Sequence, residues 1–448
     1  MKVDKKNYFS TFQIIIWSFL FVILLGAFLL MLPCSTRGTD SASFLDALFT
    51  STSAVCVTGL AIHDTATYWS TFGQSVILLL IQIGGMGVVT VAAFIPMVSG
   101  RKIGLMQRST MQEAIAAPQM GGIVRLTKFI LKITVLVELL GAIIMFPVFY
   151  QKFGGVKGVW YAVFHSISAF CNAGFDLMGI KTPFSSLTSY SANPVISLAI
   201  SFLIITGGIG FLTWDDIATN KWHFKRYRMQ SKVILTVTGA LILLPALYFY
   251  CYEFSQVQWD GISKMERALS ALFQSVTPRT AGFNTVDLTS LSETGQTILI
   301  VLMLTGGSPG STAGGMKTTT VAVLLLTAIS VFRRRENACC FGRRISNDAI
   351  RNAATVFLLY LLLFLFGGIL ISCIEGLPVL SCLFEAASAI GTVGLSLGIT
   401  TQLGAASRLI LIGLMYFGRV GGLTLIFATL SGSHPNISKL PQEMITIG

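Results

Sequence analysis

The sequence predicts an all-α membrane protein in which four tandem repeats surround one central pore. The 448 residues are 53% hydrophobic and only 11% charged, whereas soluble proteins average about 25% charged residues. Apolar runs of the roughly 20 residues needed to cross a bilayer recur along the chain. Between them lie four short loops, whose glycines at 59, 174, 282 and 394 are 115, 108 and 112 residues apart. Such near-constant spacing indicates an internal repeat.

Eight apolar runs are the candidate membrane spans, and they alternate in pairs with the glycine loops. Each repeat is therefore predicted as span, short helix, loop, span. We place the repeats at residues 1–100, 101–220, 221–335 and 336–448, the last with a short cytoplasmic tail. The predicted spans are Phe12–Leu32, Phe72–Val98, Phe129–Tyr150, Pro194–Trp214, Val233–Tyr252, the broken run Thr294–Phe332, Ala353–Cys373 and Leu409–Leu430.

The four glycine loops are the predicted ion filter. Each follows an apolar stretch of about 12 residues, which is too short to cross and is predicted to be re-entrant. Non-helical backbone at membrane depth is tolerated only inside protein or beside a water-filled cavity. Potassium channels use Thr-Val-Gly to present backbone carbonyls to a dehydrated K⁺ ion. The alternative is that each glycine only ends a short helix. The loops are Val57-Thr58-Gly59, Asn172-Ala173-Gly174, Thr280-Ala281-Gly282 and Thr392-Val393-Gly394.

The charge distribution predicts which side of the membrane each linker faces. The net charge is +12, and the segments between repeats are the most basic, for example Arg333–Arg335. The positive-inside rule places these linkers, and both termini, in the cytoplasm of a multi-pass cell-membrane protein. No basic stripe is interleaved with surface aromatics, so binding to nucleic acid is not expected. The first apolar run is too long for the core of a signal peptide.

A glycine-rich segment interrupts the sixth run and is the predicted gate. Two Gly-Gly pairs and a proline cannot continue a regular helix, so we expect a broken helix facing the pore. The alternatives are an aqueous turn between two spans and a phosphate-binding loop, although the Gly-Lys-Thr spacing of that motif is off by one. The gate residues are Gly306, Gly307, Ser308, Pro309, Gly310, Ser311, Thr312, Ala313, Gly314, Gly315 and Lys317.

Arg419, near the middle of the last run, is assigned to the same gate. A central arginine costs about 2.5–3.5 kcal/mol on insertion scales, so it should not face lipid. The functional interpretation is a positive charge below the filter that opposes cation passage. The alternative is a structural tie to a neighbouring carbonyl.

Several further charged residues have two interpretations each. Asp64, Asp176 and Asp287 follow three of the filters and either concentrate cations at the outer mouth or are solvated loop acids. Glu138 is either an interhelical hydrogen-bond partner or part of an ion route.

Two charged residues lie close to the filters themselves. Glu385 either braces the fourth filter by bonding loop amides or fills a packing role. Arg279 directly precedes a filter and is expected to point away from the pore axis.

The repeats and loop sequences resemble the Trk/Ktr/HKT potassium transporters. The segments 168–175 (SAFCNAGF), 277–284 (TPRTAGFN) and 388–395 (SAIGTVGL) look like the bacterial KtrB-type subunit. The resemblance implies K⁺ uptake and a homodimer with one pore per subunit. It also implies a cytosolic ring of RCK subunits, which would bind ATP/ADP or NAD(H). Relatives that prefer Na⁺ carry serine at the first filter glycine, so Gly59 favours K⁺ or mixed K⁺/Na⁺ passage.

Other functional classes fit the sequence less well. An enzyme needs convergent titratable or metal-binding groups, and neither an H-E-x-x-H nor a G-x-S-x-G motif is present. A receptor without transport would not need four pore-like loops. No cofactor is expected in this chain beyond the transported K⁺, which would contact the filter carbonyls. Channel-like flow and ion-coupled symport with Na⁺ both remain open.

Overall fold

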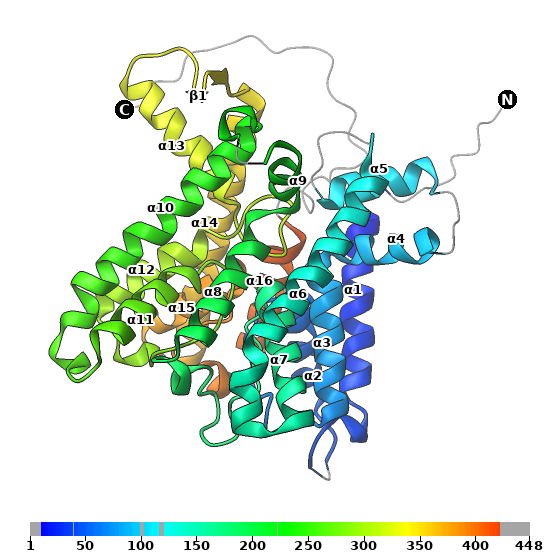
Figure 1. Ribbon diagram of the computed structural model, residues 1–448, viewed down its shortest axis with the longest axis vertical. Coiled ribbons are helices and arrows are strands. Elements are labelled where there is room, and N and C mark those ends of the chain that lie inside the picture. The colour runs from blue at the N-terminus through cyan, green and yellow to red at the C-terminus, as the bar shows by residue number, and fades with distance from the viewer. Residues whose placement is uncertain (1–9, 39, 99–102, 116–120, 222, 422–448) are drawn as a thin grey trace.

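The computed structural model describes residues 10–38, 40–98, 103–115, 121–221 and 223–421, and most of them are helical (Figure 1). The only described strands, β1 (Cys339–Cys340) and β2 (Arg343–Arg344), form a small antiparallel hairpin. Short 3-10 turns lie at Pro33–Ser35, Thr188–Tyr190, Phe224–Arg226, Glu253–Ser255, Val257–Trp259, Leu288–Ser290 and Thr400–Gln402. The helices are α1 (Thr11–Leu30), α2 (Phe44–Val55), α3 (Thr71–Met86), α4 (Val88–Val98), α5 (Leu105–Ile115), α6 (Ile123–Phe153), α7 (Gly155–Phe170), α8 (Pro194–Ile209), α9 (Phe211–Asn220), α10 (Met229–Cys251), α11 (Lys264–Val276), α12 (Glu293–Leu304), α13 (Thr318–Phe332), α14 (Asn347–Glu375), α15 (Val379–Gly391) and α16 (Ala405–Val420).

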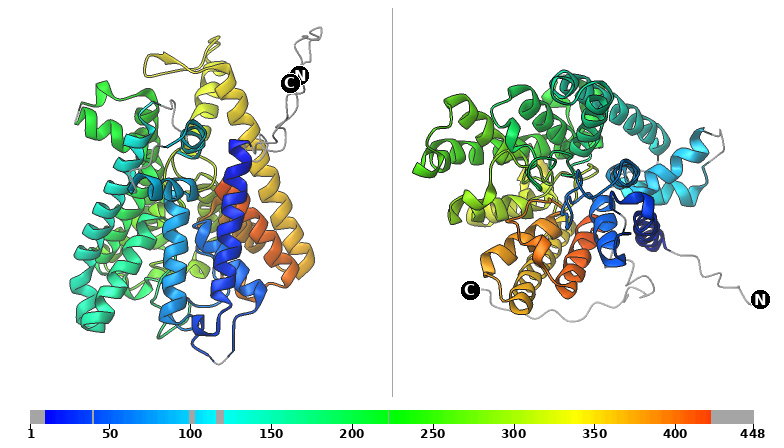
Figure 2. Two further views of the ribbon diagram at one scale, coloured as in Figure 1. Left: turned by 90° about the vertical axis from the view of Figure 1, so that its right-hand side faces the viewer. Right: turned by 90° about the horizontal axis from the view of Figure 1, so that it is seen from below.

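The same order of elements occurs four times along the chain. A long helix (α1, α6, α10 or α14) is followed by a short buried helix (α2, α7, α11 or α15) and a glycine loop. A second helix then begins, as α3, α8, α12 or α16. Seen end-on, these groups surround a common centre in chain order (Figure 2, right). We call α2, α7, α11 and α15 the pore helices.

The prediction of a continuous second span is wrong in the first, second and fourth repeats, whereas the third was predicted to be broken and is. The described residues contain four helices long and apolar enough to cross a membrane, or five if the bent pair α8–α9 counts as one. The other predicted spans break at Gly87, Gly210 and Gly421, with φ of 86°, 98° and 91°, or at the glycine-rich gate segment. Helices α8 and α9 meet at 94°. Positive φ ends a helix while the apolar composition continues, so hydropathy did not reveal the breaks.

The exterior of the long helices is apolar, as expected for contact with hydrocarbon. On α6, Leu136, Leu139 and Ile143 are 54%, 56% and 65% exposed, whereas Glu138 on the same helix is 8% exposed. A soluble protein would place these residue types the other way round. The chain is therefore an integral membrane protein. Both chain termini, which are predicted to be cytoplasmic, lie outside the described residues, and so does the end of the last predicted span.

Close helix contacts fix the first two pore helices. The hydroxyl of Ser51 donates to the carbonyl of Ile23, and that of Ser166 donates to the carbonyl of Glu138, both at 2.6 Å. Glycines lie opposite these serines, because a Cβ on Gly26 or Gly141 would come within 3.0 Å of the serine oxygen. Helices α2 and α7 can therefore pack directly against the long helices α1 and α6.

Candidate functional site: a four-loop filter and its gate

The backbone of the filter loops has the same handedness pattern in all four repeats. The glycine and the residue two positions before it both have positive φ. The residue two positions before the glycine is β-branched in every repeat except the second, where it is Asn172. For a β-branched residue, positive φ is a genuine outlier. An outlier repeated four times indicates a functional constraint. The φ values are 58° and 90° for Val57 and Gly59, 59° and 69° for Asn172 and Gly174, 73° and 79° for Thr280 and Gly282, and 51° and 92° for Thr392 and Gly394.

The four glycines form a closed ring. A Cβ on any of them would lie under 3.0 Å from the carbonyl oxygen that precedes a neighbouring glycine. Gly59 meets Ala173, Gly174 meets Ala281, Gly282 meets Val393 and Gly394 meets Thr58. Because this sequence of contacts returns to its start, the loops enclose a single axis, and a side chain at any of these positions would break the ring.

The filter carbonyls are left free of protein partners. Within the described residues, no hydrogen bond is accepted by the carbonyl oxygens of Thr58, Ala173, Ala281 or Val393. Buried carbonyls are otherwise almost always paired. Unpaired carbonyls around one axis can replace the water shell of a cation.

Hydrogen bonds to the pore helices hold these loops in place. The backbone N–H groups of Thr58, Ala173, Ala281 and Val393 donate to carbonyls at the ends of their own pore helices, at 2.7–2.9 Å. In the first and fourth repeats, the hydroxyls of Ser53 and Ser388 also accept from the N–H groups of Gly59 and Gly394, at 3.0 Å. In the second and third, Ser168 and Thr277 donate instead to the carbonyls of Phe175 and Phe283, at 2.7 Å.

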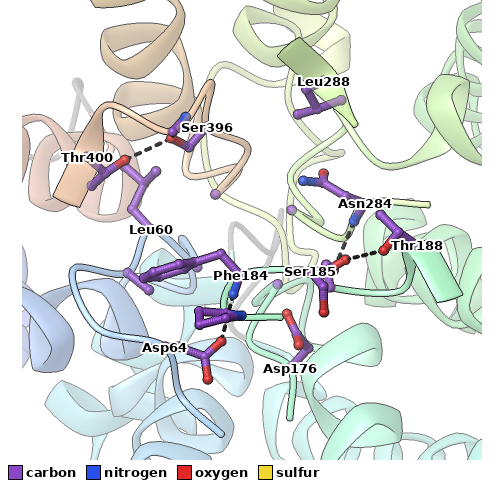
Figure 3. Close-up of a pocket in the computed structure, with 18 of the residues that line it drawn as sticks. Leu60, Asp64, Asp176, Phe184, Ser185, Thr188, Asn284, Leu288, Ser396 and Thr400 are labelled. Atoms are coloured by element: carbon purple, nitrogen blue, oxygen red, sulfur yellow. Dashed lines mark hydrogen bonds between the residues drawn. The ribbon is translucent and has the colours of Figure 1, made fainter. Parts of the chain in front are cut away.

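A cavity of about 450 Å³ opens on one side of the ring, and all four filter glycines line it. Asp64, Asp176 and Asp287 line it as well, and Figure 3 shows the first two facing it. Asp64 is bonded rather than freely solvated, since it accepts the N–H groups of Ala66 and Phe184 at 3.0 and 2.9 Å. We call this cavity the outer vestibule.

The remaining acids and Arg279 lie beside the filter rather than on its axis. Glu385 accepts the hydroxyls of Ser396 and Thr400 in the loop after the fourth filter, the latter at 2.9 Å. Glu138 accepts from Gln82 of α3 at 3.3 Å, which is an interhelical contact. Arg279 is 5% exposed and donates to Thr238 of α10 at 3.3 Å, so its side chain points to the long helix of its own repeat.

The predicted gate segment is a compact loop closed at its base. The N–H of Gly306 donates to Met316 at 2.8 Å, and that of Thr318 donates to Gly307 at 3.0 Å. We call residues 306–315 the gate loop.

The gate loop lies directly against the filter. The N–H and hydroxyl of Thr312 donate to Gly207 of α8 and Phe170 of α7, at 3.2 and 3.0 Å. A Cβ on Gly314 would meet the Thr392 side chain, and one on Gly315 would lie 2.8 Å from the Gly391 carbonyl oxygen. The gate loop therefore contacts α7, α8 and the end of the fourth pore helix, next to its filter loop.

Arg419 joins three parts of the molecule beneath the filter. Its guanidinium donates to the carbonyl of Thr312 in the gate loop and to those of Gly84 and Gly85 at the end of α3, the last at 3.2 Å. Lys317 donates to the carbonyls of Ala313 and Gly314, at 2.8 and 3.4 Å. The alternative considered for Arg419, a structural bond to neighbouring carbonyls, is therefore present, and one of the bonded carbonyls belongs to the gate loop.

A second cavity, of about 320 Å³, lies on the other side of the gate loop. Arg419, Lys317 and Glu113 line it, together with the helix breaks at Gly87 and Gly421. The gate loop thus contacts the fourth filter loop and also lines this second cavity. Sequence reasoning did not identify the helix breaks or the hydroxyl anchors, although a serine or threonine five or six positions before each filter glycine was a visible signal.

Residues 4–435 match the family model TrkH, described as a cation transport protein. The chain belongs to the TrkH family. Two relatives match this TrkH-family chain over nearly its full length. The potassium/sodium uptake protein NtpJ of Enterococcus hirae is 38% identical over 100% of this chain and 99% of that protein. The Ktr system potassium uptake protein B of Bacillus subtilis is 39% identical over 99% and 98%.

A solved structure of the TrkH family has the same fold. The potassium transporter TrkH from Vibrio parahaemolyticus superimposes with a TM-score of 0.71 at 22% identity, covering 95% of this chain and 86% of that one.

Proposed function

We propose that this chain is the pore-forming subunit of a potassium uptake system. The observation that carries the proposal is the closed ring of four glycines bordered by unpaired carbonyls. Such a ring can replace the hydration shell of a monovalent cation. The names of the full-length relatives, which are potassium and potassium/sodium uptake proteins, support K⁺ as the main ion.

Each of the four repeats crosses the membrane twice in this proposal. The long helices α1, α6, α10 and α14 make four crossings. The second helices α3, α8 and α16 have 16 residues each, or about 24 Å at 1.5 Å per residue. They are shorter than the hydrocarbon core of about 30 Å, so the second crossings of these repeats end beside the second cavity, where non-helical backbone is tolerated.

The gate loop controls flow through this pore. It lies on the axis beneath the filter, and Arg419 ties it to α3 and α16. The conducting state requires the loop to leave the axis, so its bonds to Gly207 and Phe170 must exchange for bonds to water. Arg419 adds a positive charge that opposes cation passage while the loop is in place.

The subunit acts as a homodimer in the plasma membrane, with both termini in the cytoplasm and a cytosolic ring of RCK-type subunits attached. The word "system" in the names of the Ktr relatives supports further components. The ring would bind ATP/ADP or NAD(H), and this chain would bind no nucleotide. The surface of this chain that docks the ring includes the basic linker 333–351. There, Phe341 in the β1–β2 hairpin packs against Phe224, which lies in the linker between the second and third repeats.

A second candidate is ion-coupled symport, in which Na⁺ drives K⁺ uptake through the same fold. The name of the Enterococcus hirae relative includes sodium, which favours this candidate. The filter geometry is compatible with both channel-like flow and symport, because the filter determines which ion passes and not which gradient drives the ion.

K⁺ flux into vesicles containing the purified protein tests the proposal. We expect uptake driven by a K⁺ gradient alone, with Na⁺ entering more slowly. Uptake that requires a Na⁺ gradient would favour symport. Vesicles with correctly folded protein and its cytosolic ring, but with the same K⁺ flux as empty vesicles, with or without Na⁺, would contradict both.

A further inference from the structure

One loop of the second repeat runs across the outer vestibule and contacts the post-filter segments of two other repeats. Residues 182–186 line the vestibule together with the four filter glycines. We call residues 182–187 the outer strap. Figure 3 shows Phe184 and Ser185 of the strap close to Asp64 and Asn284, which belong to the first and third repeats.

The strap is fixed by backbone hydrogen bonds on both sides. The N–H of Phe184 donates to the Asp64 carboxylate at 2.9 Å. On the other side, the Asn284 N–H donates to the Ser186 hydroxyl at 3.1 Å, and the Leu187 N–H donates to the Asn284 carbonyl at 2.8 Å. Both backbone groups of Asn284 are therefore used, and Asn284 lies two residues after the filter glycine Gly282.

The strap adopts an uncommon backbone conformation to make these bonds. Phe184 and Ser186 have φ of 58° and 46°, in the left-handed region that few non-glycine residues occupy. Such conformations persist only where the surrounding structure over-determines them. Ser186 is 5% exposed, and its hydroxyl accepts the N–H of Asn284. This side chain thus links the strap of the second repeat to the post-filter segment of the third.

The third pore helix supplies one bond fewer to its post-filter segment than the second and fourth pore helices do, although Thr277 still donates to the carbonyl of Phe283. The residue nine positions before the filter glycine is His165 in the second repeat, Phe273 in the third and Glu385 in the fourth. His165 Nε2 accepts the N–H of Leu177 at 3.3 Å, and Glu385 accepts the hydroxyls of Ser396 and Thr400. Phe273 has no side-chain acceptor, so the third repeat lacks the bond that His165 and Glu385 make at this position.

We propose that Ser186 is a positioning residue for ion selectivity, which supplies the side-chain acceptor that the third pore helix lacks at Phe273. It acts through Asn284 on the Thr280-Ala281-Gly282 loop and sets the position of the Ala281 carbonyl in the ring. The proposal rests on the proposed function, because selectivity is meaningful only if the ring conducts ions.

Substitutions at Ser186 test this role by relative uptake of K⁺ and Na⁺ into vesicles. Ser186→Ala removes the hydroxyl, and Ser186→Gly removes it while relieving the backbone strain. One neutral hydrogen bond contributes about 0.5–1.5 kcal/mol, so the K⁺ over Na⁺ preference should fall by roughly three- to tenfold in both. Ser186→Asn tolerates positive φ and keeps an acceptor, so it should restore most of the preference.

Ser185→Ala is the matched control. Its hydroxyl faces the Met178 carbonyl at 3.4 Å, within its own repeat, so its loss should leave the preference unchanged. If the glycine variant transports K⁺ with wild-type preference, the proposal is overturned, whatever the folding of the alanine variant. Absence of K⁺ uptake by the wild-type protein would instead contradict the proposed function.

Discussion

The filter glycines are the residues on which the pore depends most directly. Each combines a positive φ with a close approach to a carbonyl of another repeat, and both requirements exclude a side chain. The sequence identified these positions because the requirement is local and recurs at regular spacing. It left the role of Glu385 open between bracing and packing, and it could not show that Ser186 bonds Asn284, since that contact joins two different repeats.

Replacing Gly59 with serine should weaken discrimination between K⁺ and Na⁺. The new Cβ would meet the Ala173 carbonyl, and a φ of 90° is unfavourable for serine. A displacement costing about 1.4 kcal/mol in relative binding changes the preference about tenfold. Relative Rb⁺ and Na⁺ uptake measures it. An unchanged ratio in a folded Gly59→Ser protein would remove Gly59 from the filter.

Asp176 should make uptake depend on external pH. Desolvation, together with the nearby Asp64 carboxylate, raises the pKa of Asp176 to about 7, although bonds from Met178 and Ser186 act in the opposite direction. The side chain is therefore neutral below this pH and negative above it. A negative charge at the outer mouth attracts cations, so uptake at low external K⁺ should rise several-fold between about pH 6 and 8.

Asp176→Asn is the test of that pH dependence. It is nearly isosteric and does not ionise, so its uptake should be flat across this range. Initial rates at several external pH values, with the internal pH held constant, give the comparison. A pH profile shared by both proteins would assign the dependence to another group.

Replacing Arg419 with alanine should increase flux through a subunit that lacks its regulatory partner. The change removes a positive charge beneath the filter and the bond to the Thr312 carbonyl. Hydrogen bonds from charged groups contribute about 1.5–3 kcal/mol, so the open fraction should rise about tenfold or more. Arg419→Lys keeps the charge but cannot reach all three carbonyls. Its flux should therefore lie between that of the wild-type protein and that of Arg419→Ala. Equal flux in all three proteins, at matched expression, would refute a gating role.

Among the elements, the second helices of the first, second and fourth repeats explain most of the difference between expectation and structure. The short helix predicted before the first filter is present as α2, and the long helices extend the predicted spans by a few residues at most ends. By contrast, the predicted span Phe72–Val98 is two helices that meet at Gly87. An isolated glycine in an apolar run either continues a helix or ends it. The sequence alone does not distinguish these outcomes, because packing around the pore determines which one occurs.

Deleting residues 307–314 should leave the fold and K⁺ preference largely intact while raising flux and removing dependence on the partner. The flanking glycines are already adjacent, because a Cβ on Gly306 would lie 3.3 Å from the Gly315 carbonyl carbon. The chain can therefore close without displacing α12 or α13. Flux should be compared with and without the cytosolic ring. A deletion protein that stays closed, or needs the ring to the same degree, would make the gate loop a passive linker.

For the whole molecule, the central claim is that four unequal repeats in one chain build one four-sided filter. Every repeat contributes a pore helix, a glycine and a free carbonyl, but the braces differ: Ser53 and Ser388 in one pair, Ser168 and Thr277 in the other. A single chain permits such differences, whereas four identical subunits would not. The regular spacing predicted the number of repeats, and three-dimensional contacts were needed to show that the ring closes.

The measurement that tests this claim most directly is the position of a heavy K⁺ analogue in the protein. Crystals soaked in Tl⁺ or Rb⁺, with anomalous diffraction, locate the ions independently of any assumption about the pore. The account predicts density on the axis at the level of the Thr58, Ala173, Ala281 and Val393 carbonyls, and competition by K⁺. Protein that transports K⁺ but binds these ions only away from the ring of glycines would contradict it.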